Sequence, residues 1–167
     1  MTKTRLTILE YPDPRLLQVA APIERIDDPL RRLMDDMATT LRETSSVGLA
    51  ATQVGVLLRL IVVDESEGRE EPIVLVNPEI VSRALPGMSE EKCLSVPGFY
   101  FPRNRYPFAR VRGVDLDGNP VELSGEGLMA QALQHEVDHL DGHLYIEGLA
   151  PETKKEAMRL IRMAPWY

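Results

Sequence analysis

One pentapeptide constrains this 167-residue chain more than any other feature: His135-Glu136-Val137-Asp138-His139. Apolar residues recur around it at helical spacing over residues 126–140, so this segment is expected to be a helix. Residues four apart share one helix face, and the two imidazoles could therefore reach one metal ion. Glu136 lies beside them and could handle the proton of a water molecule in such a site. The alternative is a surface helix with coincidental histidines, although two of the chain's three histidines lie here.

A third ligand is needed, because a catalytic metal site usually has three protein ligands and one open position. From spacing alone, it could be a carboxylate, a histidine or a thiolate. Cys93, the chain's one cysteine, stands out within the short extended stretch of residues 91–97. A lone cysteine is more often a packed core residue than a ligand, so the residues by themselves leave both roles open.

Composition indicates a globular, acidic protein without an intramolecular disulfide. Apolar residues make up 44 % of the chain, enough for the core of one domain over residues 1–167. The formal net charge of -7 argues against binding nucleic acid through the whole surface, and no DNA partner is expected. The single cysteine suits a reducing compartment. We expect a cytoplasmic protein without membrane contact, because neither a secretory signal nor a span-length apolar run is recognisable.

Helices and strands are expected to follow one another irregularly along the chain. One helix is predicted over residues 29–43 with Asp28 as its cap, and another over residues 153–163. Runs rich in β-branched residues predict strands, with a turn at Asn77-Pro78. The predicted strands cover residues 60–63, 73–76, 79–84, 111–116 and 121–124, the last two forming a hairpin. This order predicts an α+β fold with small mixed or antiparallel sheets around the central motif-bearing helix, plus a C-terminal helix.

Three segments together resemble the signature motifs of the peptide deformylase family. They are Gly48-Leu49-Ala50-Ala51-Thr52-Gln53, Glu91-Lys92-Cys93-Leu94-Ser95 and Gln134-His135-Glu136-Val137-Asp138-His139-Leu140. Their order and spacing agree with the family, and the similarity runs from about residue 11 to about residue 149. The resemblance implies a hydrolase that removes the formyl group from the N-terminal methionine of nascent peptides and releases formate.

The resemblance also implies how the reaction centre is built. Cys93, His135 and His139 would hold the metal, with water as the fourth ligand. The ion is typically Fe²⁺ in this family, and Zn²⁺, Ni²⁺ or Co²⁺ could substitute for it. Glu136 would accept a proton from the water and later protonate the leaving amine.

Substrate recognition is implied by the same resemblance. The Gln53 side-chain amide and the Leu94 backbone N–H would stabilise negative charge on the formyl oxygen. The peptide would add as a strand through backbone groups of Val47, Gly48 and Lys92. Candidates for the methionine pocket are Val47, Leu128, Ala132 and the ring of His135. For Leu128 and Ala132, ordinary core packing is an equal alternative.

Two positions depart from the family pattern. Ser46 stands where the family usually has glycine two residues before Gly48, and Lys92 stands where it usually has glycine before the metal-binding cysteine. Neither position supplies a catalytic side chain, so the metal site should be unaffected. As a hypothesis, Lys92 narrows the peptide groove and favours acidic residues downstream of the methionine.

Two further features have alternatives that the sequence leaves open. Asp138 could orient a ligating imidazole, remain solvated, or bond to an arginine such as Arg103 or Arg105. The aromatic cluster Phe99-Tyr100-Phe101 could cap the groove or pack on the sheet, and packing is favoured.

The C-terminal helix is locally basic in an otherwise acidic chain. A solvated helix face is one explanation. In bacterial relatives the terminal helix can dock on the ribosome, so a transient ribosome contact is the other. The basic residues are Lys154, Lys155, Arg159 and Arg162.

Two other functions compete with the deformylase hypothesis. A zinc peptidase of the His-Glu-x-x-His type would use a carboxylate or histidine as third ligand and would need neither Cys93 nor Gln53. A silent relative used for binding would have no need of Glu136. Replacing Cys93 by alanine should abolish metal binding only in a deformylase.

Overall fold

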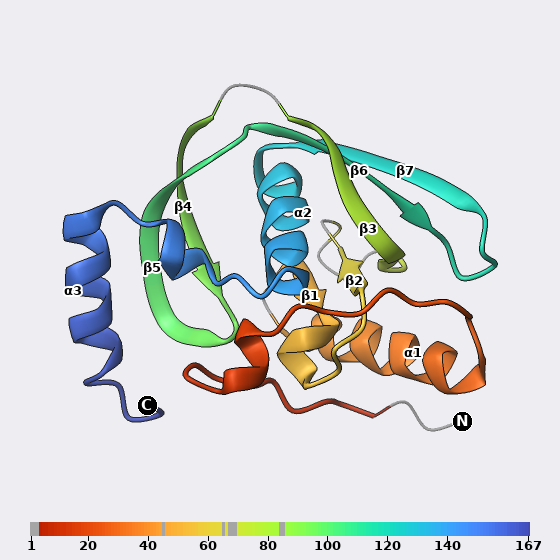
Figure 1. The fold of residues 1–167 in the computed structure, drawn as a ribbon, viewed down its shortest axis with the longest axis horizontal. Coiled ribbons are helices and arrows are strands. Elements are labelled where there is room, and N and C mark those ends of the chain that lie inside the picture. The colour runs from red at the N-terminus through yellow and green to blue at the C-terminus, as the bar shows by residue number, and fades with distance from the viewer. Residues whose placement is uncertain (1–3, 45, 65, 67–69, 84–85) are drawn as a thin grey trace.

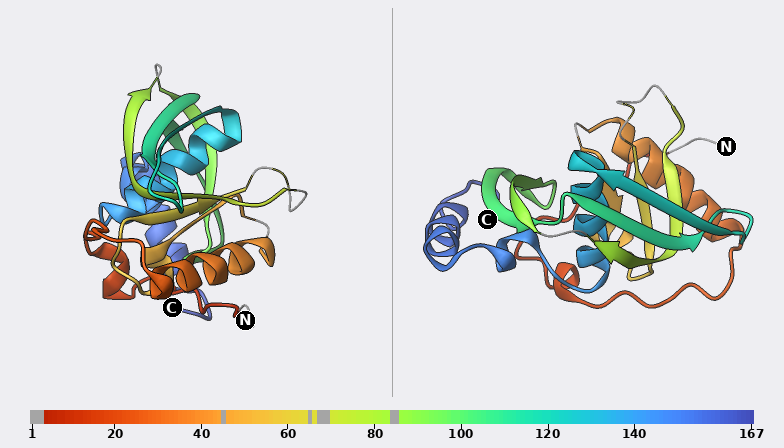
Figure 2. Two further views of the ribbon diagram at one scale, coloured as in Figure 1. Left: turned by 90° about the vertical axis from the view of Figure 1, so that its right-hand side faces the viewer. Right: turned by 90° about the horizontal axis from the view of Figure 1, so that it is seen from above.

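The computed structural model describes residues 4–44, 46–64, 66, 70–83 and 86–167, which form the predicted α+β fold (Figure 1, Figure 2). Five antiparallel strands form one sheet in the order β1-β2-β3-β6-β7, and two more form a separate hairpin. The strands are β1 (Gly48–Ala50), β2 (Leu60–Val63), β3 (Ile73–Arg83), β4 (Gly87–Cys93), β5 (Val96–Arg105), β6 (Phe108–Val114) and β7 (Pro120–Glu126). The helices are α1 (Asp28–Arg42), α2 (Gly127–Leu140) and α3 (Pro151–Ile161), with short 3-10 helices η1 (Pro14–Leu17), η2 (Ala51–Val54) and η3 (Tyr145–Gly148).

The first strands of the large sheet are covered on both faces, which explains their unbroken apolar runs. Side chains alternate along a strand, so Ile61 and Val63 join the core that includes α2, whereas Leu60 and Val62 join the core that includes α1. All four side chains are fully buried. The motif-bearing helix α2 therefore lies on one face of the sheet and α1 on the other (Figure 1).

Two predicted helices form with small shifts at their ends. Asp27, rather than Asp28, caps α1, because its carboxylate accepts the Leu30 N–H at 3.1 Å. The C-terminal helix begins at Pro151 and ends at Ile161, two residues before the predicted bounds. Proline suits the first turn because the N–H that it lacks would have no partner inside the helix.

The predicted turn at Asn77-Pro78 is wrong. Strand β3 continues through it from Ile73 to Arg83, with a register shift against β6 between Val76 and Glu79. Asn77 has φ 51°, and its side-chain amide exchanges two 2.8 Å hydrogen bonds with the backbone of Ile23. Pro78 has no backbone N–H to donate to the neighbouring strand, and a β-bulge accommodates it. The two predicted strands are therefore one bulged strand. Position 84, the predicted end of the second strand, lies outside the described residues.

The predicted hairpin is confirmed, with longer arms. Strand β6 pairs with β7 from Phe108↔Glu126 to Val114↔Pro120. The Asp115 carboxylate accepts the N–H groups of Asp117 and Asn119 at 2.9 Å in the turn. Because β7 leads directly into α2, this hairpin sets the start of the motif-bearing helix.

The hairpin of β4 and β5 lies between α2 and α3 (Figure 1, Figure 2). It shares a separate apolar cluster with η3 and α3, in which the Phe99 and Phe101 rings stack 5.9 Å apart. Packing, the favoured alternative for these two aromatic residues, is what the structure shows. Tyr100 alternates to the opposite side and is 62 % exposed. Within the described residues, none of the helices combines the length and the apolar character needed to cross a bilayer.

Candidate metal centre

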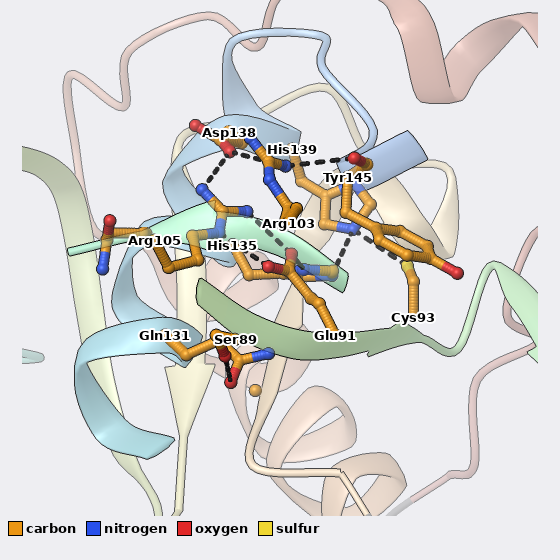
Figure 3. Close-up of polar contacts among 12 residues, drawn as sticks. Ser89, Glu91, Cys93, Arg103, Arg105, Gln131, His135, Asp138, His139 and Tyr145 are labelled. Carbon is orange, nitrogen blue, oxygen red and sulfur yellow. Dashed lines mark hydrogen bonds and ion pairs between the residues drawn. The ribbon is translucent and has the colours of Figure 1, made fainter. Parts of the chain in front are cut away.

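The side chains predicted to bind a metal converge between α2 and the end of β4 (Figure 3). His135 and His139 lie one helical turn apart, and their Nε2 atoms are separated by 3.1 Å. Cys93 is the last residue of β4, and its Sγ lies 3.2 Å from His139 Nε2. All three side chains are buried. The structure thus brings the two imidazoles together with the thiol, although 42 residues separate Cys93 from His135 in sequence.

The three donor atoms fit a divalent cation. They lie within 4.8 Å of one another, and the described part of the chain contains no other group of three or more such ligands. Bonds of about 2.3 Å to sulfur and about 2.0–2.1 Å to nitrogen place neighbouring donors about 3.3–3.6 Å apart in a tetrahedron. The two separations given above are only slightly shorter. The three side chains are therefore suited to hold one cation together.

Burial and neighbouring charge act differently on the two imidazoles. Burial disfavours the charged form of His135, but negative charge at Cys93 and the hydrogen bonds to Cys93 and Glu91 raise its pKa well above the usual value. Burial lowers the pKa of His139 well below the usual value, and positive charge at His135 adds to this effect. The negative groups that favour a proton on His135 would also favour a cation, and a neutral imidazole is the ligating form.

Glu136 supplies a buried carboxyl group beside the ligands. It is 2 % exposed, and among the described residues none hydrogen-bonds to its Oε2 atom. Burial raises the pKa of Glu136 to about 7, although the positive charge of His135 opposes this. The side chain packs on Gly48, where an added Cβ would lie 2.7 Å from Glu136 Cγ. A carboxyl group with this pKa and an unused oxygen is suited to accept a proton and return it.

Gln53 directs its amide NH₂ toward the cysteine side of the site. Its Oε1 accepts the Ala50 N–H at 2.9 Å, while Nε2 donates to Ser95 Oγ at 3.3 Å and to Cys93 Sγ at 3.6 Å. The Ala50 bond identifies the oxygen end of the amide, so the donor end faces the site. The backbone N–H of Ser95 also donates to Sγ, at 3.4 Å. Ser95 lies inside the second motif, but no role was predicted for it from the sequence.

A network of charged residues that was not predicted from the sequence contacts the Nδ1 side of the His135 ring (Figure 3). Glu91 Oε1 lies 2.5 Å from His135 Nδ1, and Arg105 donates to both Glu91 oxygens at 2.7 Å. Burial favours the neutral acid, but the hydrogen bonds from Arg105 and His135 lower the pKa of Glu91 to about 2. The ionised carboxylate therefore fixes the ring with Nε2 turned toward the other donors.

Of the alternatives for Asp138, the structure shows the arginine contact. Asp138 Oδ2 accepts from Arg105 Nη1 at 2.7 Å and lies 3.8 Å from Arg103 Nη1. The imidazole-orienting role belongs to Glu91 instead. One sequence signal could have indicated this: Glu91 and Cys93 are two apart in a strand and therefore share a face.

A hollow, here called the site hollow, opens beside these groups. Its walls include the four residues predicted for a methionine pocket: Val47, Leu128, Ala132 and His135. Leu128 is 54 % exposed, so it belongs to the wall rather than to the core. The remaining lining residues are Ser46, Gly48, Gln53, Lys92, Leu94, Gln131 and Glu136.

Two strand edges flank the site hollow. Strand β1 is the edge of the large sheet, and β4 pairs with β5 alone among the described strands. The Asp64 N–H donates to the Val47 carbonyl at 2.8 Å, so Val47 faces β2 with its backbone polar groups. Successive residues of an antiparallel strand direct these groups to opposite sides, and the Gly48 N–H and C=O therefore point away from β2. The Ser46 hydroxyl donates to that Gly48 carbonyl at 3.2 Å. Open strand edges of this kind can take an extended peptide as an added strand.

Known proteins with similar sequences and structures share one family. Residues 5–155 match the family model described as polypeptide deformylase. A peptide deformylase of Azotobacter vinelandii is 52 % identical over 157 residues, and the match covers 92 % of each chain. A peptide deformylase of Alkalilimnicola ehrlichii is 50 % identical over 155 residues, and the match covers 92 % of this chain and 86 % of that protein. The crystal structure of a peptide deformylase from Legionella pneumophila superposes with a TM-score of 0.91 at 44 % identity, covering 96 % of this chain and 95 % of that one. A Synechococcus elongatus peptide deformylase in complex with actinonin gives 0.90 at 35 % identity, covering 99 % and 92 %.

Proposed function

This chain belongs to the polypeptide deformylase family, and on that premise we propose which of its residues carry out the reaction. It is a metal-dependent hydrolase that removes the formyl group from the N-terminal methionine of newly synthesised polypeptides. We assign the metal to Cys93, His135 and His139, and the convergence of their donor atoms within 4.8 Å carries the proposal. Fe²⁺ is the proposed ion because of the family resemblance, while Zn²⁺, Ni²⁺ and Co²⁺ suit the same donors.

Glu136 is the proposed proton carrier. When bound, a divalent cation polarises the formyl oxygen and lowers the pKa of water in the site. Glu136 accepts a proton from the water molecule whose oxygen attacks the formyl carbon. The C–N bond then breaks, and Glu136 returns the proton to the leaving nitrogen, which yields a free methionine amino group and formic acid, and the acid loses its proton to solvent as formate. A pKa of about 7 allows one carboxyl group to perform both transfers near neutral pH.

Gln53 and Leu94 are proposed to stabilise the negative charge that develops on the formyl oxygen. The Gln53 NH₂ is held in place by the hydrogen bond between its own Oε1 and Ala50, so little reorganisation is needed during the reaction. Leu94 lies on the wall of the site hollow next to Cys93, where its backbone N–H is the second proposed donor.

The peptide is proposed to bind between the open edges of β1 and β4. On the β1 side it would meet Val47 and Gly48, and on the β4 side it would meet the backbone of Lys92. The methionine side chain would enter the site hollow against Leu128, Ala132 and the ring of His135. The outward-facing backbone groups of Gly48 support this arrangement.

Formate release from formyl-Met-Ala-Ser tests these assignments. Nickel-substituted wild type should release formate, whereas Glu136→Gln should retain its metal and lose activity by about 10²-fold or more. Loss of metal from this variant would contradict a role for Glu136 in proton transfer alone. Activity close to wild type would overturn the assignment.

Two finer points belong to the same proposal: a cytoplasmic location and a transient ribosome contact through α3. The exposed positions of Lys155, Arg159 and Arg162 support the contact, although Arg159 is already paired with Glu156 at 2.6 Å. Lys155→Glu combined with Arg162→Glu should weaken co-sedimentation with ribosomes without changing hydrolysis of a tripeptide. Unchanged co-sedimentation would count against the contact. Charge reversal is preferable to truncation, because α3 contributes Ala157 and Ile161 to the apolar cluster under β5.

A further inference from the structure

Gln131 is a polar member of the α2 face that lines the site hollow. Leu128, Gln131, Ala132 and His135 all line this hollow. They are spaced three or four residues apart, so their side chains lie on one face of the helix. The glutamine therefore places an amide group beside Leu128 and Ala132, on the wall against which the methionine side chain is proposed to bind.

Two hydrogen bonds to β4 hold this amide in place. The Ser89 hydroxyl donates to Gln131 Oε1 at 3.0 Å (Figure 3). Gln131 Nε2 donates to the Glu90 carbonyl at 2.9 Å. The first bond identifies the oxygen end of the amide and the second identifies its nitrogen end. The side chain thus crosses from α2 to β4, and the amide is ordered before a substrate binds.

The pairing of β4 explains why the Glu90 carbonyl is open to this bond. Glu90 lies opposite Pro102 in the hairpin of β4 and β5, and proline has no backbone N–H. The Glu90 carbonyl therefore receives no hydrogen bond from the residue opposite it and accepts the Gln131 amide instead. Turning the amide away would break this bond, so we expect Gln131 to keep its position when the site hollow is occupied.

The nitrogen of this amide can donate a second hydrogen bond. A glutamine NH₂ group carries two N–H donors, and among the described residues Gln131 Nε2 uses one, toward Glu90. The thioether sulfur of methionine is a weak acceptor for the other. Oxidation to methionine sulfoxide makes the same side chain polar by adding an oxygen atom to the sulfur. That oxygen is a better acceptor for a fixed N–H on the wall.

We propose that Gln131 is a specificity-determining residue that allows the site hollow to accept methionine sulfoxide as the first side chain, as well as methionine. This inference rests on the proposed placement of the methionine side chain in the site hollow. It goes further by adding a substrate class, formyl peptides whose first methionine is already oxidised. A wall without a donor would exclude the sulfoxide, because a polar group buried without a hydrogen bond is costly.

The test compares kcat/KM of the nickel-loaded enzyme for formyl-Met-Ala-Ser and for its methionine sulfoxide and norleucine counterparts. For the better sulfoxide epimer, wild type should lose less than about ten-fold relative to methionine. Gln131→Met removes the amide but keeps an unbranched side chain of similar length. It should lower the sulfoxide-to-methionine ratio on the order of five-fold, the range of one neutral hydrogen bond. The norleucine-to-methionine ratio should not fall, because norleucine has no acceptor.

A matched variant separates this effect from a general effect of the substitution. Gln18→Met makes the same change at an exposed glutamine that is not among the residues lining the site hollow, and it should leave both ratios unchanged. A wild-type loss of ten-fold or more for both epimers, or a sulfoxide ratio unchanged in Gln131→Met, would overturn the inference while leaving the proposed function intact. Equal falls in the sulfoxide and norleucine ratios would also overturn it, because they would indicate a change of shape. Absence of formate from formyl-Met-Ala-Ser itself would instead overturn the proposed function, and this inference with it.

Discussion

Two parts of the site differ in how their charges and side chains are surrounded: the buried network beside His135, here called the back, and the exposed residues around the opening of the site, here called the rim. At the back, Glu91 is 1 % exposed and Arg105 is 7 % exposed, and each charge is matched by hydrogen bonds to its neighbours. At the rim, Leu128 and Tyr100 are more than half exposed, and Lys92 departs from the family pattern. A charge at the back is costly to leave unpaired, whereas water screens an exposed charge and makes its pairing matter less.

This difference separates chemistry from selection. Residues at the back hold the proposed metal ligands and the proposed proton carrier in position, where small displacements are costly. Residues at the rim would contact parts of the proposed peptide substrate that do not react. We therefore expect changes at the back to alter metal content, rate or stability, and changes at the rim to alter which peptide is preferred.

The largest effect is expected for Cys93→Ala. Removal of one of three protein ligands should reduce the metal content of the purified protein to a small fraction of wild type and abolish formate release. His143→Ala is the control, because His143 is exposed, pairs with Glu147 at 3.1 Å and takes no part in the ligand cluster. Elemental analysis checks both. Full metal content in Cys93→Ala would favour the zinc-peptidase alternative with a different third ligand.

Gly48→Ala should leave the metal in place and still reduce kcat/KM by about 10²-fold or more. The added methyl group would overlap the Glu136 side chain, which must then move from its present position. Gly87→Ala is the matched control, since none of the described residues has an atom within 4 Å of an added Cβ there. Steady-state rates with metal content measured in parallel would show the effect. Wild-type activity of Gly48→Ala would mean that Glu136 need not occupy this position.

Glu91 should make stability depend on pH. Its folded-state pKa of about 2 is below the ordinary 4.5, so its contribution is present above pH 4.5 and is lost as the pH falls toward 2. The shift corresponds to about 3 kcal/mol of unfolding free energy. Urea unfolding of metal-free protein at several pH values, compared with Glu91→Gln, isolates this contribution because other carboxylates titrate in both proteins. Parallel pH profiles for the two proteins would contradict it.

Local sequence features predicted the elements of this site better than the connections between them. The spacing of His135 and His139 predicted a shared helix face, because helical periodicity is a local property. The motif resemblance selected Cys93, which periodicity alone left undecided. The contact between Glu91 and Arg105 was not predicted, since it depends on how β4 pairs with β5 and on the position of α2 against both.

The error at Asn77-Pro78 has a similar cause. An asparagine-proline pair between two β-branched runs is a reasonable local turn signal. In the structure, the backbone of Ile23, 54 residues earlier in the chain, binds the Asn77 side chain and stabilises a bulge within one strand. A contact so distant in sequence leaves no local pattern from which it could be predicted. Alternation in β4 and β5 was also hidden, because charged residues such as Glu91 and Arg105 occupy buried positions.

The smallest effect is expected at the rim, for Leu128→Ala. Leu128 is half exposed in the free protein, so its truncation should change the free energy of unfolding by less than about 0.5 kcal/mol. A bound methionine side chain would cover part of it, and losing that contact should lower kcat/KM about three- to ten-fold, in line with roughly 0.8 kcal/mol per buried CH₂. Leu116→Ala is the control, because Leu116 is an exposed leucine that is not among the residues lining the site hollow. The loss should be greater for formyl-methionyl than for formyl-alanyl peptides, whose side chain is too short to reach the wall. An equal loss for both peptides would place Leu128 outside the methionine pocket and would mean that this part of the rim supports the site rather than selects its substrate.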